Sequence, residues 1–238
     1  MVNGRGGGLS TRQRVYAEVR RRIVSLELRP GTSLSENEIA SHAGVSRTPV
    51  RESLILLADE GLVQIFPKLG SFVARIDVER VADAQFVREA IELASLVDAV
   101  AAVDAKILKD LRAQIARQRS ATDVSEFFEL DEHFHRSLLE AGGHGSAWRT
   151  VTGAKAHLDR ARRLGIVSEG SLQTLIDEHE AVVNALEERD GTAAVAALKA
   201  HLRKVVSDIG AIRERSPELF VDGNDDARPT RRVVSVWE

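Results

Sequence analysis

The stretch that most constrains the fold is residues 34–51, where two helix-forming segments flank a single glycine. Ser35 can cap a helix over "ENEIASHA", and Gly44 supplies the tight turn that ends it. The next segment, "SRTPVRESLILLADEG", predicts a further helix. Thr48 and Pro49 suit its N-cap and first turn, because the N–H that proline lacks would be unpaired there anyway. Two helices joined through one glycine favour a helix-turn-helix.

The flanking segments extend this pattern into a small domain. Before it, Val15, Val19, Ile23 and Leu26 repeat at helical spacing, and "RPG" ends that helix. After it, "LVQIF" and "SFVARI" have the composition of two strands joined by the turn "PKLG". This order predicts a winged helix-turn-helix of three helices and a β-hairpin over residues 12–75. In such a domain the helix after the turn enters the major groove of DNA.

Several polar residues of this domain are candidates for DNA contacts. Arg47 and Arg51 lie one turn apart at the start of the predicted recognition helix, where they suit bidentate recognition of guanine. Thr48 suits a phosphate or a thymine methyl group, and Lys68 in the hairpin turn suits the DNA backbone. The alternative is that the two arginines only solvate an exposed helix end.

The charge distribution along the sequence favours binding of a polyanion by the N-terminal part of the chain. Residues 1–75 hold 11 Lys and Arg against 7 Asp and Glu, whereas the other residues hold 22 against 29. A split of this size is also common between ordinary domains, so it favours nucleic acid only weakly.

The rest of the chain predicts an all-α antiparallel bundle, since it lacks strand-like alternation. We expect residues 1–11 to be disordered, 76–79 to be a linker, 80–214 to be the helical domain and 215–238 to be a flexible tail. The chain as a whole is therefore predicted to be mainly α. The six predicted helices cover residues 77–103, 106–119, 123–141, 145–164, 169–188 and 191–214.

Three of these helices place metal-ligand side chains on apolar faces. Asp131 and His135 share the inward face of "DEHFHR", which His133 does not. His179 and His201 each lie in the middle of an apolar stripe on a later helix. Burying such groups is costly unless they are paired or share a cation. The chain has no cysteine, so its candidate metals are those that imidazole and carboxylate suit: Zn first, then Ni, Mn or Fe. A hydrogen-bonded network without metal is the alternative.

Residues 12–75 resemble the DNA-binding domain of GntR-family regulators. The similarity rests on "LRPGTSLSENEIASHAGVSRTPVRESLILLADEGLV" and "KLGSFV". It implies that Arg47, Thr48 and Arg51 contact bases and phosphates beside Ser46, and that Gly70 lets the wing approach DNA. Asn37 departs from the pattern, because some relatives carry an arginine there, and no DNA contact is carried onto it.

Residues 80–214 resemble the FCD ligand-sensing domain of the FadR subfamily, through "VREAIELASLVDAV", "DEHFHRSL" and "HEAVVNALEERDGTAAVAALKAHL". Six helices are more similar to the VanR-type subgroup than to FadR itself. The resemblance implies a divalent metal held by the following four residues: Asp131, His135, His179 and His201.

The FCD resemblance also implies that Arg88 holds an effector carboxylate. The alternative for Arg88 is a salt bridge with Glu92 at i+4. Arg162 and His157 are weaker candidates for the pocket wall. His144 and His42 match no ligand position.

These features together predict a cytoplasmic, homodimeric repressor of a metabolic operon. It would bind a palindromic operator in double-stranded DNA and leave it when a small organic acid binds at the metal, with a hinge at Ile76–Val78. No membrane partner is expected, because no apolar run is long enough to span a bilayer. A regulator with a purely structural metal is one alternative. A metal-dependent hydrolase or lyase is another, although no "HExxH"-type signature accompanies the Asp–His set.

Overall fold

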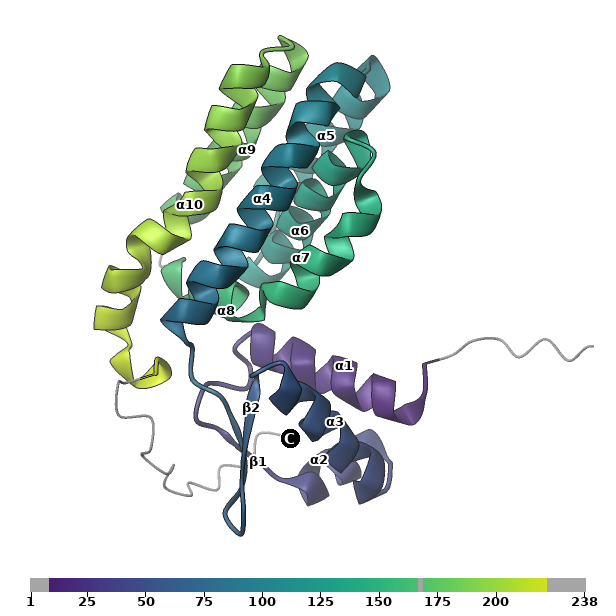
Figure 1. The fold of residues 1–238 in the computed structure, drawn as a ribbon, viewed down its shortest axis with the longest axis vertical. Helices are drawn as coiled ribbons and strands as arrows, with labels where there is room; N and C mark the ends of the chain where they lie inside the picture. Colours follow the sequence, from purple (N-terminus) through teal and green to yellow (C-terminus); the bar gives the residue numbers. More distant parts are fainter. Residues whose placement is uncertain (1–8, 167–168, 222–238) are drawn as a thin grey trace, which may run out of the picture. The chain divides into compact units, whose positions relative to one another are not determined.

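The computed structural model describes residues 9–166 and 169–221. The chain divides into two compact units. The N-terminal unit consists of Met1–Ile76 with Pro217–Glu238, and the bundle unit consists of Asp77–Ser216. The predicted mainly α fold, with a winged helix-turn-helix followed by a helical bundle, is confirmed (Figure 1).

Within its described residues, the N-terminal unit holds three α-helices, a 3₁₀ turn at Pro217–Leu219 and a small sheet. The strands pair antiparallel in the order β1-β3-β2, with Val63 opposite Val73 and Ser33 opposite Phe72. β1 was not predicted, because two residues are too short to show alternation. The elements are α1 (Thr11–Val24), β1 (Ser33–Leu34), α2 (Glu36–Ala43), α3 (Arg47–Asp59), β2 (Val63–Phe66) and β3 (Gly70–Val73).

The turn between α2 and α3 forms where the sequence predicts it. The Ser35 hydroxyl caps α2, and Gly44 ends that helix with φ of 64°, a left-handed conformation that glycine adopts without strain. Ser46 rather than Thr48 is the N-cap of α3, so that prediction was wrong. Thr48 and Pro49 lie in the first turn of α3. Backbone N–H groups have no intrahelical acceptor there, so the N–H that proline lacks costs the helix no hydrogen bond.

The N-terminus and the C-terminal segment both differ from the predicted boundaries. Ser10 caps α1 within the segment expected to be disordered. The predicted flexible tail is helical at Arg215, and Phe220 is fully buried in a parallel bridge with Ile76. The Ile76 N–H donates to the Leu219 carbonyl oxygen at 2.9 Å. The buried apolar side chains of Leu219 and Phe220 stabilise the position of this segment. The remaining parts of both predictions lie outside the described residues.

The bundle unit is built from long helices that lie side by side (Figure 1). Apolar side chains such as Leu96, Phe127, Phe134 and Leu198 are fully buried between them. Within the described residues its helices are α4 (Val78–Ala102), α5 (Ala105–Arg119), α6 (Val124–Ala141), α7 (Trp148–Ala154), α8 (Ala156–Gly165), α9 (Glu169–Glu187) and α10 (Gly191–Arg215), with a 3₁₀ turn at Gly145–Ala147.

The prediction of one helix over residues 145–164 was wrong, because this stretch divides at Lys155. Lys155 ends α7 and precedes α8, and its side chain is buried. Its ammonium donates to Glu132 on α6 and to Asp159 at 2.6 Å. These ion pairs of a buried lysine stabilise the break between α7 and α8, and local helix propensity does not predict them.

Across the described segments, we find no helix whose length and apolar character would allow it to cross a membrane.

Candidate metal centre and nucleic-acid interface

The four predicted ligand residues meet in the interior of the bundle. Asp131 and His135 come from α6, His179 from α9 and His201 from α10, and all four are buried. His201 Nε2 lies 3.2 Å from both His135 Nε2 and His179 Nε2. Asp131 Oδ1 lies 3.7 Å from His135 Nε2 and 3.5 Å from His179 Nε2. One potential ligand atom from each residue therefore faces a common point.

The opposite nitrogen of each imidazole is committed to a side-chain oxygen. Glu92 and Glu178 are carboxylates, and the Gln118 amide is oriented because its Nε2 donates to the Leu130 carbonyl oxygen at 3.3 Å. Each Nδ1 therefore carries the proton, and each Nε2 presents a lone pair. The Nδ1 partners are Glu92 Oε2 for His135 at 2.7 Å, Gln118 Oε1 for His179 at 2.8 Å and Glu178 Oε2 for His201 at 2.8 Å.

This arrangement fits a divalent cation. Three lone pairs that face one another without a proton between them repel unless a positive charge lies among them. Two nitrogens bound to one ion at about 2.1 Å, with an angle of about 100° between the bonds, lie about 3.2 Å apart. The observed spacing of 3.2 Å matches this value. Three imidazoles and one carboxylate suit Zn, Ni, Mn or Fe(II).

The electrostatics of the cluster keep most of its imidazoles neutral. Burial lowers the pKa of His201 to about 4 and that of His179 well below its usual value. Burial also opposes the charged form of His135, but the adjacent Glu92 carboxylate raises the pKa of His135 overall. A neutral imidazole is the form that binds a metal.

Arg162 on α8 holds the carboxylate of the cluster. Its Nη2 donates to both oxygens of Asp131 at 2.9 Å. Burial opposes ionisation of Asp131, but Arg162 and His135 lower its pKa well below the usual value. Arg162 Nη1 is also buried, and no residue described in the structure accepts a hydrogen bond from it.

Arg88 forms the salt bridge that was its alternative interpretation. Its Nε donates to Glu92 Oε1 at 2.7 Å, and both side chains are buried. Burial opposes ionisation of Glu92, yet Arg88 and His135 lower its pKa to about 2. Glu92 therefore joins Arg88 on one oxygen to His135 on the other.

A cavity of about 480 Å³ adjoins the cluster. Arg88, Arg162 and His201 line it, together with apolar side chains such as Leu202 and Val205. Three guanidinium groups, those of Arg88, Arg162 and Arg215, thus line the same space as one cluster imidazole, together with the charged side chains of Lys204 and Asp208. A pocket of this size, in which several cationic side chains converge, suits a small ligand.

The other histidines lie elsewhere. His157 does not line the cavity; its Nδ1 accepts from the Asp77 N–H at 3.2 Å and from Arg160 Nη2 at 3.0 Å. His144 Nε2 lies 2.7 Å from Asp98 Oδ2. His42 and His133 are exposed, outside the cluster.

Sequence analysis missed the three partners of the imidazoles. Glu92 was considered only as a partner of Arg88, and Glu178 directly precedes a candidate ligand in the sequence. Gln118 is 61 residues from His179, and the sequence carries no signal for their contact.

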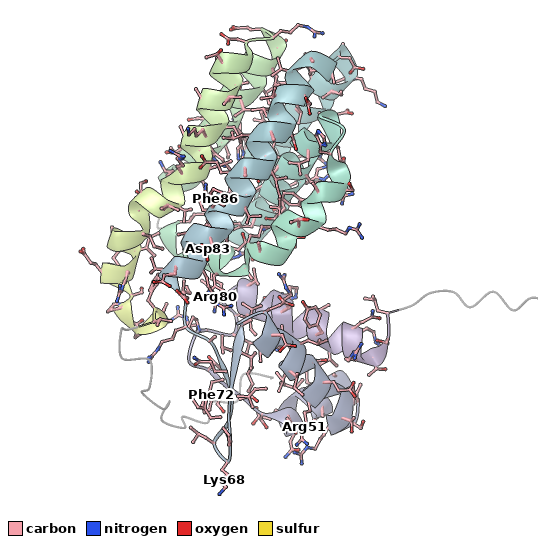
Figure 2. The ribbon with its side chains drawn as sticks, viewed as in Figure 1. Arg51, Lys68, Phe72, Arg80, Asp83 and Phe86 are labelled. Carbon is pink, nitrogen blue, oxygen red and sulfur yellow. The ribbon has the colours of Figure 1, made fainter. Side chains whose placement is uncertain are left out.

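The predicted DNA-contact residues gather on an exposed part of the N-terminal unit. Arg47, Arg51, Lys68 and Gly70 line one groove of about 670 Å³, while Ser46 and Thr48 are exposed at the start of α3 beside them. Figure 2 shows Lys68 at the tip of the hairpin. Gly70 has φ of 121°, a conformation that is open almost only to glycine.

Both parts of the molecule are similar to known protein families. Residues 11–73 match the model of bacterial regulatory proteins of the gntR family, and residues 83–204 match the FCD domain. An HTH-type transcriptional regulator of Streptomyces ambofaciens is 52% identical over 97% of this chain and 98% of that protein. The transcriptional repressor RspR of Escherichia coli is 35% identical over 87% of this chain and 92% of its own length.

Solved structures share the fold. Escherichia coli McbR/YncC has a TM-score of 0.71 at 16% identity, over 87% of this chain and 99% of that one. A GntR regulator from Rhodococcus sp. RHA1 has a TM-score of 0.70 at 22% identity, over 85% of this chain and 99% of that one. The chain therefore belongs to the GntR family of bacterial transcriptional regulators: it is a DNA-binding regulator with an FCD domain, and not an enzyme.

Proposed function

We propose that this regulator is a homodimeric repressor of a metabolic operon, released from a palindromic operator by a small carboxylate at a divalent metal. Repressor relatives support the direction of regulation: RspR, and the gluconate operon transcriptional repressor of Bacillus subtilis, which is 30% identical over 76% of this chain. The proposed metal ligands are Asp131, His135, His179 and His201.

The observation that carries the proposal is the shared cavity beside the cluster. His201 belongs to both the cluster and the cavity lining, and Arg88 and Arg162 line the same space. Arginine suits bidentate recognition of a carboxylate. Arg162 has a buried nitrogen without a hydrogen-bond acceptor among the described residues, and a carboxylate oxygen would satisfy it.

Zn is the proposed metal, and Ni, Mn or Fe(II) fit the same donor set. When bound, the ion supplies positive charge between the three lone pairs and open coordination positions for an acid. The chain's own contribution is to fix the imidazoles through Glu92, Gln118 and Glu178.

α8 is the proposed route from the cavity to the start of the bundle. Near its C-terminal end Arg162 holds Asp131, and near its N-terminal end His157 accepts from the backbone N–H of Asp77, which caps α4. An acid that draws Arg162 away from Asp131 would shift α8 and this contact. Within the predicted hinge at Ile76–Val78, we propose Asp77 as the residue that moves. Ile76 is held by a backbone hydrogen bond to Leu219, and Val78 is the first residue of α4.

The proposed DNA contacts are Ser46, Arg47, Thr48, Arg51, Lys68 and Gly70. The groove that four of them line supports this assignment. A homodimer is supported by exposed apolar side chains on α4, where Phe86 is 75% and Val97 58% exposed. Figure 2 labels Phe86 on this helix.

The test combines stability and DNA binding. Metal-loaded protein is screened against small mono-, di- and hydroxycarboxylates, with a duplex that the wild-type chain selects from a random library. We expect one acid class to stabilise the protein by about 2.7 kcal/mol at a hundredfold excess over its Kd, and to weaken DNA binding. Both effects should vanish after chelation and in His179→Ala. DNA affinity that stays unchanged at saturating acid contradicts the release mechanism. Strong destabilisation on chelation, without any response to acids, indicates a structural metal.

A further inference from the structure

Glu36, the first residue of α2, binds both arginines that are proposed to read bases. Its Oε2 accepts from Arg47 Nη2 at 2.8 Å and from Arg47 Nε at 3.3 Å. Its Oε1 accepts from Arg51 Nε at 3.0 Å, and its Oε2 accepts from Arg51 Nη2 at 3.3 Å. One carboxylate on α2 thus connects two guanidinium groups on α3.

Both arginines use the same edge for this contact. Each binds Glu36 through Nε and Nη2, and Nη1 of each has no hydrogen bond among the residues that the structure describes. The arginine side chains stay 60% and 65% exposed, whereas Glu36 is 21% exposed. The Glu36 carboxylate therefore lies largely shielded from solvent, and the outer edges of the two guanidinium groups remain exposed and available for hydrogen bonds to DNA.

A guanidinium group presents its five N–H donors in a rigid plane. When one edge is bound, the orientation of the other edge is fixed as well. The outer edge carries two parallel N–H donors, which match the O6 and N7 acceptors of guanine in the major groove. An exposed arginine without such a partner can turn instead toward any nearby phosphate.

The negative charge of Glu36 also favours specific over non-specific DNA binding. Hydrogen bonds from Arg51 and Arg47 lower the pKa of Glu36, so its carboxylate is ionised at neutral pH. Three side chains that would otherwise contribute two positive charges then contribute a net charge of one. Binding to DNA of arbitrary sequence depends on phosphate neutralisation, so this negative charge weakens it.

We propose that Glu36 is a specificity-determining positioning residue, which orients Arg47 and Arg51 toward guanine and reduces binding to DNA outside the operator. The inference rests on the proposed DNA contacts of the two arginines. It adds a residue on α2 to a recognition surface otherwise assigned to α3 and the hairpin.

Glu38 provides a matched control on the same helix end. It lies in the first turn of α2, as Glu36 does, and its side chain has no hydrogen bond or ion pair within the described part of the chain. Glu38→Gln removes the same charge from nearly the same place without releasing an arginine. A purely electrostatic effect should therefore be similar for both substitutions.

The experiment compares full-length wild type, Glu36→Gln and Glu38→Gln. A duplex selected by the wild-type chain and a scrambled duplex are titrated by fluorescence anisotropy at several salt concentrations, and each variant is also used to select from the random library. For Glu36→Gln we expect tighter binding of the scrambled duplex and a loss of about tenfold in the ratio of the two affinities. Guanine preference in its selected sequences should weaken. Glu38→Gln should keep both the ratio and the preference.

The outcomes separate this inference from the proposed function. Equal changes for Glu36→Gln and Glu38→Gln on both duplexes would mean that Glu36 acts only as a surface charge. Normal binding by Arg47→Ala and Arg51→Ala would overturn the proposed DNA contacts themselves. Loss of binding in these arginine variants, with unchanged specificity in Glu36→Gln, overturns only the role of Glu36. Glu36→Gln keeps the size of the side chain, and its thermal unfolding is measured to exclude loss of fold.

Discussion

A single nitrogen of Arg162 donates to both carboxylate oxygens of Asp131, at 2.9 Å each. Arg162 also lines the cavity beside the cluster, and its other terminal nitrogen is buried without an acceptor among the described residues. One guanidinium group therefore joins a candidate metal ligand to a candidate effector pocket.

The first prediction concerns the cluster ligands. His135→Ala should reduce the affinity for Zn by about 100-fold or more, because it removes one of four ligand atoms that face a common point. His133→Ala is the matched control, since this neighbouring histidine on α6 is exposed. Isothermal titration of chelator-stripped protein with Zn measures both. Equal Zn affinity of the two variants would contradict the assignment of the cluster.

The second prediction separates acid binding from metal binding. Arg162→Met should keep one metal per chain but lose the stabilisation by acids, because the cavity loses the guanidinium group that lies against Asp131 of the cluster. Arg163→Met is the control: Arg163 packs over the Phe128 ring at 4.2 Å and does not line the cavity. Metal content and thermal shifts with the acid panel decide the matter. An unchanged acid response in Arg162→Met would remove Arg162 from the site.

The third prediction is a pH dependence of the metal-free protein. Burial lowers the pKa of His201 to about 4 and lowers that of His179 as well, so below about pH 6.5 the unfolded state takes up protons that the folded state does not. Stability should therefore fall as the pH drops from about 6.5 to 4, by at most about 1.4 kcal/mol per unit for each of these two groups. The raised pKa of His135 acts above this window, because its stabilising contribution is fully present below about pH 6.5 and is lost only as the pH rises through its folded-state pKa.

Urea denaturation in the presence of a chelator, at several pH values, measures this slope. His201→Gln should flatten it, because the substituted side chain does not titrate. With Zn present the fall should be steeper, since protons also displace the metal from its ligands. Stability that rises on acidification would refute the prediction.

The fourth prediction concerns the wing. Lys68 has φ of 66°, which a residue with a Cβ adopts at a cost of about 1 kcal/mol. Lys68→Ala should reduce the salt slope of DNA binding by about one ion. Lys68→Gly should reduce the slope equally but make the N-terminal unit more stable, because glycine adopts a positive φ without strain. A wild-type salt slope in both variants would exclude a phosphate contact of Lys68.

The fifth prediction concerns the C-terminal segment. Phe220 is fully buried and pairs with Ile76, so Phe220→Ala should destabilise the N-terminal unit by about 3 kcal/mol or more. Hydrogen exchange at the Ile76 and Val221 amides should become faster, because these amides form the hydrogen bonds beside the bridge. Leu9→Ala, at a side chain that is 61% exposed, is the control. Unchanged exchange at both amides would show that the segment adds little stability.

Local sequence patterns were sufficient to predict which faces of the helices are buried. Asp131 and His135 are four residues apart on a helix, so both had to face the same side, and apolar neighbours showed that this side is the interior. The same reasoning placed His179 and His201 inward. The Gly44 turn and the composition of the two hairpin strands likewise predicted the winged helix-turn-helix, because turn chemistry and strand composition are local properties.

Which side chains meet, by contrast, depends on how the elements pack in three dimensions. The contact of Gln118 with His179 spans 61 residues, and those of Glu36 with the two arginines span 11 and 15. At Lys155, where the predicted helix divides, the ammonium group binds the carboxylates of Glu132 and Asp159, and Glu132 lies on another helix. Periodicity reports the face on which a residue lies, but its partner across that face depends on how helices pack, and packing is not encoded in local spacing.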